Sequence, residues 1–284
     1  MKRIIFLLLI TAVFISAQVK DTLVQQEEPF FNRKNISIIG VSGFFTFSLV
    51  QSYLMWWKDD HRTFHFLNPP ANQSWFDSPG QRGIDKAGHF YTSYFLYKAQ
   101  KNILTWGGYS EKTSSLISLL FDVSFSILIE VGDGFSSYGF DYQDLVFNLG
   151  GAGFGLLQDK LSVFRNINFK WSYFPDKLAF PPEFTEHYDS HIYWMTFNLH
   201  NLLPDGVNNY WPAFLQPAIG FSVAGKGSRR ELIVGVDLNL LEIFKTDDEN
   251  WNLFISTAEL FHLPLPAIKY SKDKIPEYRL FMLN

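Results

Sequence analysis

Carboxylates and a histidine recur at helical spacing between residues 85 and 148. Asp85 and His89 are four residues apart, so on a helix they would share one face, with Lys86 beside them. An imidazole and carboxylates without thiolates suit a hard or borderline divalent cation. The same groups could form a hydrogen-bonded ionic network with Lys86 as the counter-charge, and Asp85 alone could be a helix N-cap.

A second polar stripe lies inside an apolar stretch. Asp122, Ser126 and Glu130 follow one another at intervals of four, and Asp133 is three residues further on. An unpaired charge in the middle of such a stretch would be costly, so Asp122 should be paired, bound to a cation or protonated. A stripe facing water at the rim of a soluble bundle would explain the same spacing.

A third group begins another predicted helix. Asp144 and Asn148 share a face, and Asp141 lies one turn earlier. Carboxylates near a helix N-terminus are also favoured by the helix dipole, which would account for Asp141 and Asp144 without any ligand.

The elements that must position these groups are four predicted helices at residues 36–57, 85–106, 110–130 and 141–164. In an up–down bundle, the start of the second, the end of the third and the start of the fourth lie at one end. Topology therefore predicts a shared polar cluster of Asp85, Lys86, His89, Glu130, Asp133, Asp141, Asp144 and Asn148. Within it, His89, Glu130, Asp133 and Asp144 are the candidate ligands of a divalent metal ion, whose presence the sequence leaves open.

The predicted helices are unusually apolar. Residues 36–57 are long enough to span a membrane and end in Trp56 and Trp57, which suit an interface, although a buried helix of a soluble bundle would look similar. Gly151 and Gly155 form a small-residue ridge that lets helices approach closely. We expect an α+β protein with a bundle of about four apolar helices, membrane-embedded or soluble.

The C-terminal part has strand patterns. Apolar or alternating runs at residues 192–199, 218–223, 232–240 and 253–257 follow a proline-marked linker, and residues 224–228 form a hairpin turn signal. The predicted organisation is a signal peptide at 1–17, a flexible lead at 18–35, a helical bundle at 36–166 and a small antiparallel β region at 167–284.

The N-terminus and composition indicate the compartment. Lys2 and Arg3 precede an apolar run that ends at Ser16-Ala17, a pattern typical of a secretory signal peptide, with an uncleaved anchor as the alternative. The chain has no cysteine, which excludes disulfides, thiolate sites and lipidation at a lipobox. A net charge of −4 gives no reason to expect nucleic acid as a partner. We expect an exported cell-envelope protein, in the inner membrane or facing the periplasm.

Three motifs resemble a known family. Asp-Lys-x-x-His-Phe at 85–90, Glu-x-x-Asp at 130–133 and Phe-Asp-x-x-Asp-Leu-x-x-Asn-x-x-Gly at 140–151 resemble domain of unknown function 2279, described as predicted periplasmic lipoprotein. The later stretches resemble the long members found in Bacteroidetes, and a fainter similarity runs to VanZ-like membrane proteins. The resemblance implies an envelope protein, marks the cluster residues as signature positions and implies no established activity. The missing lipobox cysteine departs from the family's description.

Two functions remain open. The first is a non-enzymatic, membrane-associated envelope protein whose polar cluster stabilises the bundle or binds a small ligand or headgroup. The alternative is a metal-assisted hydrolase acting on a lipid or cell-wall precursor, with Glu130 or Asp144 as base. An ion pathway through Asp122 would need more spans than the chain offers, unless the protein oligomerises.

Overall fold

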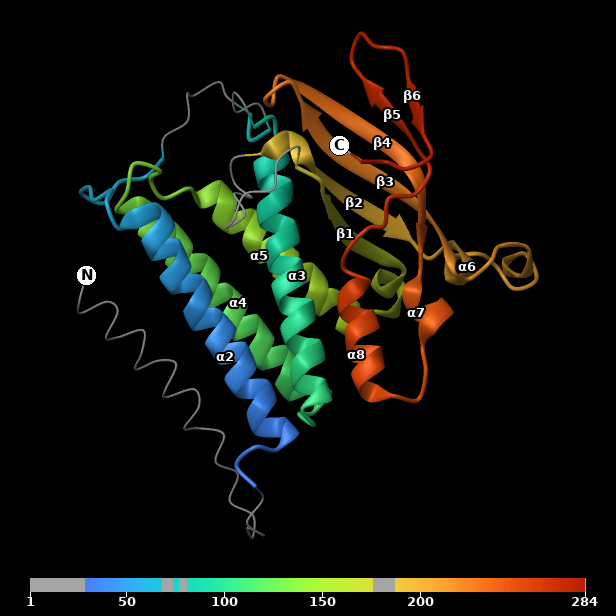
Figure 1. The fold of residues 1–284 in the computed structure, drawn as a ribbon, viewed down its shortest axis with the longest axis horizontal. Coiled ribbons are helices and arrows are strands. Elements are labelled where there is room, and N and C mark those ends of the chain that lie inside the picture. Colours follow the sequence, from blue (N-terminus) through green and yellow to red (C-terminus); the bar gives the residue numbers. More distant parts are fainter. Residues whose placement is uncertain (1–28, 68–73, 77–80, 176–186, 284) are drawn as a thin grey trace.

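The computed structural model describes residues 29–67, 74–76, 81–175 and 187–283. The predicted signal peptide and most of the predicted linker lie outside these residues. Four long helices lie side by side, and a β-sheet with three shorter helices lies beside them (Figure 1). The structure is therefore mixed α+β, with the helices in the N-terminal half.

The long helices follow the predicted order. They are α2 (Arg33–Ser52, continued by a π-helical turn at Tyr53–Trp57), α3 (Ile84–Trp106), α4 (Glu111–Gly134) and α5 (Tyr142–Lys160). Side chains cap three of the starts, because Asn32, Ser110 and Asp141 accept hydrogen bonds from the amides of Asn35, Thr113 and Gln143, respectively. Helix α4 extends through Gly132, where the Trp57 ring packs so closely that a Cβ would lie 2.3 Å from it.

The expectation of about four apolar helices is wrong. In the described residues, two helices are long and apolar enough to cross a membrane: α2 with its π-helical turn, and α4. In the apolar stretch of α2 and its π-helical turn, 11% of the residues are buried inside the protein. The corresponding share for α4 is 44%, so α4 also contributes to the core of the bundle. Helices α3 and α5 are less apolar because polar side chains join them: Lys86 pairs with Asp141 and Asp144, Tyr94 donates to Gln158, and Lys101 pairs with Asp159.

The small-residue ridge of α5 packs against α3. A Cβ on Gly151 would lie 2.0 Å from the carbonyl oxygen of Phe90, and one on Gly155 would lie 2.5 Å from the Tyr97 ring. Gly153 points elsewhere and has nothing within 4 Å of its Cβ position. The close approach of the two backbones therefore depends on Gly151 and Gly155.

Replacing Gly151 with alanine should separate α3 from α5 and lower the free energy of unfolding by about 2 kcal/mol, because overpacking displaces backbone. Gly153→Ala is the matched control, and it should raise stability by about 0.5–1 kcal/mol, because alanine favours the helix. Chemical denaturation measures both. Equal stabilities of the two variants would contradict this packing.

The six strands form one antiparallel sheet in sequence order. They are β1 (Ile167–Tyr173), β2 (His191–Phe197), β3 (Leu215–Ala224), β4 (Arg229–Leu238), β5 (Ala267–Ser271) and β6 (Glu277–Arg279). The short helices are α6 (Leu199–Leu202), α7 (Leu240–Phe244) and α8 (Glu249–Ala258). The first two strands lie nearest the bundle (Figure 1).

Three predicted strands and the hairpin turn at 224–228 are confirmed in β2, β3 and β4. The strand predicted at 253–257 is wrong, because those residues belong to α8. Asp248 caps that helix by accepting hydrogen bonds from the amides of Asn250 and Trp251. A short apolar run cannot distinguish a strand from a helix by its periodicity alone. Strands β1, β5 and β6 were not predicted.

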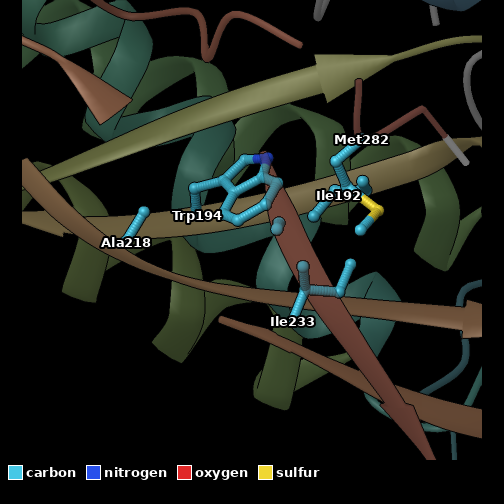
Figure 2. Packing of buried hydrophobic residues seen from close by; sticks show 6 residues of the cluster. Ile192, Trp194, Ala218, Ile233 and Met282 are labelled. Atoms are coloured by element: carbon cyan, nitrogen blue, oxygen red, sulfur yellow. The ribbon is translucent and has the colours of Figure 1, made fainter. Parts of the chain in front are cut away.

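The two faces of the sheet bury different side chains. One face holds an apolar core of Ile192, Trp194, Ala218, Ile233, Ala267 and Met282 (Figure 2). His262 stacks on Trp194 with ring centroids 3.8 Å apart. The opposite face of β1 and β2 packs its aromatic residues on Tyr91 and Tyr94 of α3. This contact fixes α3 against the sheet.

Candidate functional site

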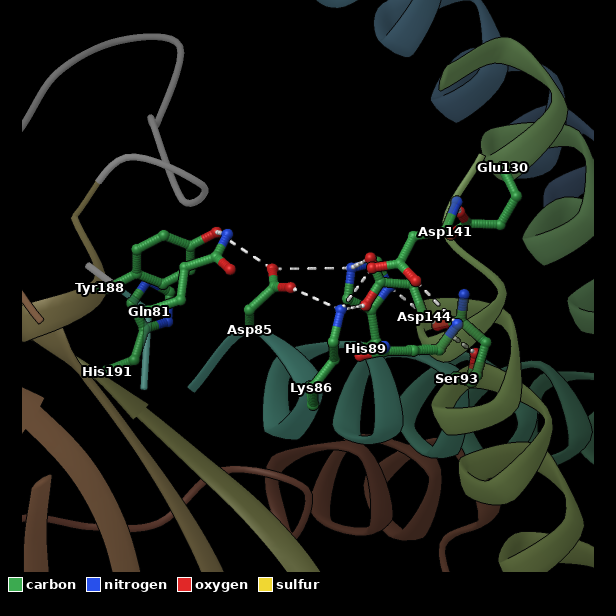
Figure 3. Close-up of polar contacts among 12 residues, drawn as sticks. Gln81, Asp85, Lys86, His89, Ser93, Glu130, Asp141, Asp144, Tyr188 and His191 are labelled. Atoms are coloured by element: carbon green, nitrogen blue, oxygen red, sulfur yellow. Dashed lines mark hydrogen bonds and ion pairs between the residues drawn. The ribbon is translucent and has the colours of Figure 1, made fainter. Parts of the chain in front are cut away.

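Helix ends bring the predicted polar groups together. The first turns of α3 supply Asp85, Lys86 and His89, and the start of α5 supplies Asp141 and Asp144 (Figure 3). We call these five residues the Lys86 cluster.

The ammonium group of Lys86 is at the centre of the cluster. Its Nζ lies 2.8 Å from Asp141 Oδ2 and 3.3 Å from Asp85 Oδ2, and it also contacts Asp144 Oδ1. The Lys86 side chain is 6% exposed. A buried ammonium is stable only when it is paired, and three carboxylates provide that pairing here.

His89 lies beside the same carboxylates. Its Nε2 is 3.7 Å from Asp85 Oδ1 and 3.5 Å from Asp144 Oδ2. Its Nδ1 lies 3.2 Å from the amide oxygen of Asn148, which can only accept, so Nδ1 is the donor. The His89 side chain is 26% exposed, whereas the other four members of the cluster are 6–16% exposed. His89 is therefore the member most accessible to a solute.

Opposite charges set the protonation of Asp85, Lys86 and His89. Burial would raise the pKa of Asp85, but His89 and Lys86 outweigh burial and bring the pKa below its ordinary value. Burial would lower the pKa values of Lys86 and His89, but the neighbouring carboxylates outweigh it and raise both. Burial raises the pKa of Asp144 to about 6.

The cluster contains more acidic than basic groups. Three carboxylates face one ammonium and one imidazole, so even a protonated His89 leaves one carboxylate charge unbalanced. A site with this balance favours a cationic group over an anion.

Glu130 and Asp133 lie at the edge of this arrangement. Glu130 is 1% exposed. Its Oε2 accepts a hydrogen bond from the Asp141 amide at 3.1 Å, while Oε1 has no partner among the described residues. Burial raises the pKa of Glu130 to about 8. Asp133 accepts a 2.7 Å hydrogen bond from the Trp57 indole, and burial raises the pKa of Asp133 to about 6.

The donors that could share one metal ion differ from the predicted set. Among the described residues, ligand atoms of Asp85, His89 and Asp144 lie within 4.8 Å of one another. Glu130 and Asp133 are not part of this group, because their carboxylates are directed to the Asp141 amide and the Trp57 indole. Lys86 contacts two of the three donors, so a dication would have to share them with an ammonium.

Tyr188 and Gln81 are two neighbours of the cluster that were not predicted. The Tyr188 hydroxyl donates to Asp85 Oδ1 at 3.1 Å, and Gln81 Nε2 donates to the Tyr188 hydroxyl at 3.4 Å (Figure 3). Ser93 donates to the Asn148 amide oxygen at 3.4 Å. Tyr188 is 103 residues from Asp85, so no local pattern could have identified this contact.

The comparison with known proteins covers the helices that form the site. No curated protein and no solved structure is detectably similar to the chain. Residues 72–160 match one family model, and this range contains every member of the Lys86 cluster. The matching model is that of the family described as predicted periplasmic lipoprotein (DUF2279), and this match agrees with an exported protein of the cell envelope.

Proposed function

We propose that this chain is a non-enzymatic, membrane-associated envelope protein whose Lys86 cluster joins α3 to α5 and binds a small cationic ligand or headgroup beside His89. The observation that carries the proposal is the unbalanced carboxylate charge around a partly exposed imidazole. Lys86 already provides an internal counter-charge, which suits a stable binding site better than a reaction centre.

The membrane association rests on α2. Its outward side chains include Ile39, Phe44, Phe47 and Val50, whose exposed fractions are 48–63%. A continuous apolar helix face of this kind is unfavourable in water and favourable against lipid. Trp56 at the end of the helix suits the lipid–water interface. The Trp57 ring instead packs on Gly132 and donates to Asp133.

The test is carried out on the full chain and has two readouts. Membrane fractionation with a carbonate wash should leave the protein in the pellet. In the purified protein, ethanolamine as a cationic probe should lower the pKa of the His89 imidazole, followed by NMR, because a second cation disfavours the imidazolium. The exposed His61 imidazole is the control and should not respond.

Each readout can contradict its part of the proposal. Release of the chain by carbonate would contradict the membrane contact. An unchanged His89 titration at saturating ethanolamine, or an equal response to acetate, would contradict a cation site.

A specific observation supports the alternative, a metal-assisted hydrolase. Asp85, His89 and Asp144 could hold a divalent ion that activates water. Repulsion between that ion and the Lys86 ammonium at shared carboxylates makes it the weaker proposal. A stoichiometric divalent metal in the purified protein, lost in Asp85→Asn, would favour the hydrolase over the proposed function.

A further inference from the structure

A large apolar pocket lies between the sheet and the helices. Its volume is about 720 Å³. Volumes of ~300–1,000 Å³ are typical of small-molecule sites. Its walls come from the start of α3, from α5, from β1 to β4 and from residues 74–76. Aromatic residues line much of these walls: Phe76, Phe90, Tyr91, Phe147, Phe169, Tyr193 and Phe221.

The tyrosine hydroxyl groups in this pocket are engaged elsewhere. Tyr91 donates a 2.6 Å hydrogen bond to the Leu260 carbonyl, and the Tyr193 hydroxyl lies 3.3 Å from the His191 ring nitrogen. Both tyrosines therefore present mainly ring surface to the pocket. A sugar or a nucleotide needs several converging polar groups, which this lining does not provide, whereas a hydrocarbon chain needs none.

The pocket continues into an apolar track on the sheet. The pairing register places Ile219 of β3 opposite Val234 of β4, and Val234 opposite Ile268 of β5. Leu232 and Tyr270 form the next pair on the same face. These five side chains are 36–50% exposed, so the apolar surface extends across three strands beyond the pocket. An extended hydrocarbon chain fits this shape.

One charged side chain stands among the described residues that line the pocket. It is Arg230, whose Nε donates to the Arg82 carbonyl at 3.0 Å and whose Nη2 donates to the Phe76 carbonyl. These contacts fix the guanidinium at the rim. A planar guanidinium recognises a carboxylate, so the charge at the rim complements an anionic headgroup.

We propose that this pocket binds a long-chain fatty-acid anion, with its carboxylate beside Arg230 and its hydrocarbon chain among the aromatic rings and along Ile219. The site is separate from the Lys86 cluster, and the proposal does not depend on a ligand there. Charge complementarity at the rim and the concave aromatic walls favour this occupant over a second copy of the chain.

Native mass spectrometry of the full chain in a non-ionic detergent tests the proposal. Palmitate should be retained at one molecule per chain, and hexadecyltrimethylammonium, which has an equally long chain and a cationic head, should not. Arg230→Gln should raise the apparent Kd for palmitate about tenfold, because the charge-assisted contact with the carboxylate is lost.

Two variants block the pocket itself. Ile219→Asp places a carboxylate on its wall, and Ala87→Phe fills it from α3; each should abolish palmitate retention. Ile243→Asp on α7 is the matched control, because Ile243 is 41% exposed and Ile219 is 39% exposed. The control should retain palmitate. Circular dichroism identifies any variant that fails to fold. If one pocket variant does not fold, palmitate retention by the other pocket variant tests the proposal.

The proposal is overturned if wild-type protein retains no palmitate, or if folded Ile219→Asp and Ala87→Phe retain it as the wild type does. Equal retention of the cationic amphiphile would overturn the role of Arg230. If the wild type forms dimers and retains no palmitate, and Ile219→Asp dissociates the dimers, this face binds a second copy of the chain. Retention of phospholipid alone would identify a lipid of a different class.

Discussion

Replacing Lys86 with methionine is expected to lower the free energy of unfolding by about 3–5 kcal/mol, the usual cost of removing one partner of a buried ion pair. The Lys86 side chain is 6% exposed, and its ammonium contacts Asp85, Asp141 and Asp144. Methionine fills a similar volume, so the loss reports on charge more than on packing. Urea denaturation of both proteins at neutral pH measures the difference.

A surface lysine provides the control. Lys112 is exposed in the first turn of α4, and Lys112→Met should change stability by no more than about 0.5 kcal/mol. Adding Asp144→Asn to Lys86→Met removes one of the unbalanced charges, so the double variant should lose less stability than Lys86→Met. A loss for Lys86→Met no greater than that of the control would mean that the cluster does not stabilise the bundle.

The deficit of Lys86→Met should also depend on pH. Without the ammonium, the pKa values of the buried carboxylates rise above those of the unfolded chain. Stability from such groups is present at low pH and is lost as the pH rises through the folded pKa values. The difference between variant and wild type should therefore shrink as the pH falls from about 7 towards 5. A constant difference would contradict the electrostatic explanation.

Asp122→Asn is expected to stabilise the protein by about 3 kcal/mol at a pH of about 9. At that pH the folded wild type must either bury an ionised carboxylate or keep the carboxyl protonated although the solution favours the ionised form. Asp122 is 0% exposed, and neither carboxylate oxygen has a hydrogen-bond partner among the described residues. Burial raises the pKa of Asp122 to about 8, although the nearby Ser93 hydroxyl acts in the opposite direction. Asparagine has a similar size and carries no charge to bury.

The sign of the pH dependence follows from the raised pKa. Both states of the wild type are protonated below pH 3.8, the ordinary value for this carboxyl. As the pH rises from there to about 8, the unfolded chain loses the proton first and the folded state loses stability. The advantage of Asp122→Asn should therefore be small at a pH of about 4 and should grow up to about pH 8.

An exposed aspartate provides the comparison. Asp205→Asn should show no such trend, because Asp205 lies at the surface. Thermal unfolding across this pH range measures both variants. A pH-independent effect of Asp122→Asn would mean that the Asp122 carboxyl is ionised and stabilised in the folded protein.

The helical half was predictable because its signals are local. The spacing of apolar residues, the cap at Ser110 and the glycines at 107 and 108 specify helices through neighbours within about one turn. The up–down order of the helices then predicts that Asp85, Lys86 and Asp144 share one end. The structure places these three side chains in contact.

The β half was less predictable because its residues are buried by distant parts of the chain. Strand β1 alternates as a strand should, but its polar Lys170 and Ser172 are on the buried face, 1% and 3% exposed. Lys170 is buried there because Asp237 and Glu259 pair with it, and both are more than sixty residues away. A prediction that assigns polar residues to the surface cannot anticipate such pairing.

For the opening cluster, the sequence by itself determined which groups are available and which end of the bundle they reach. Only the tertiary structure decided that Asp133 bonds to Trp57, that Tyr188 reaches Asp85, and that Asp85 replaces Glu130 beside His89. The physical reason is range. Helix periodicity and capping depend on residues a few positions apart, whereas pairing, burial and pKa depend on which surfaces meet when the whole chain packs.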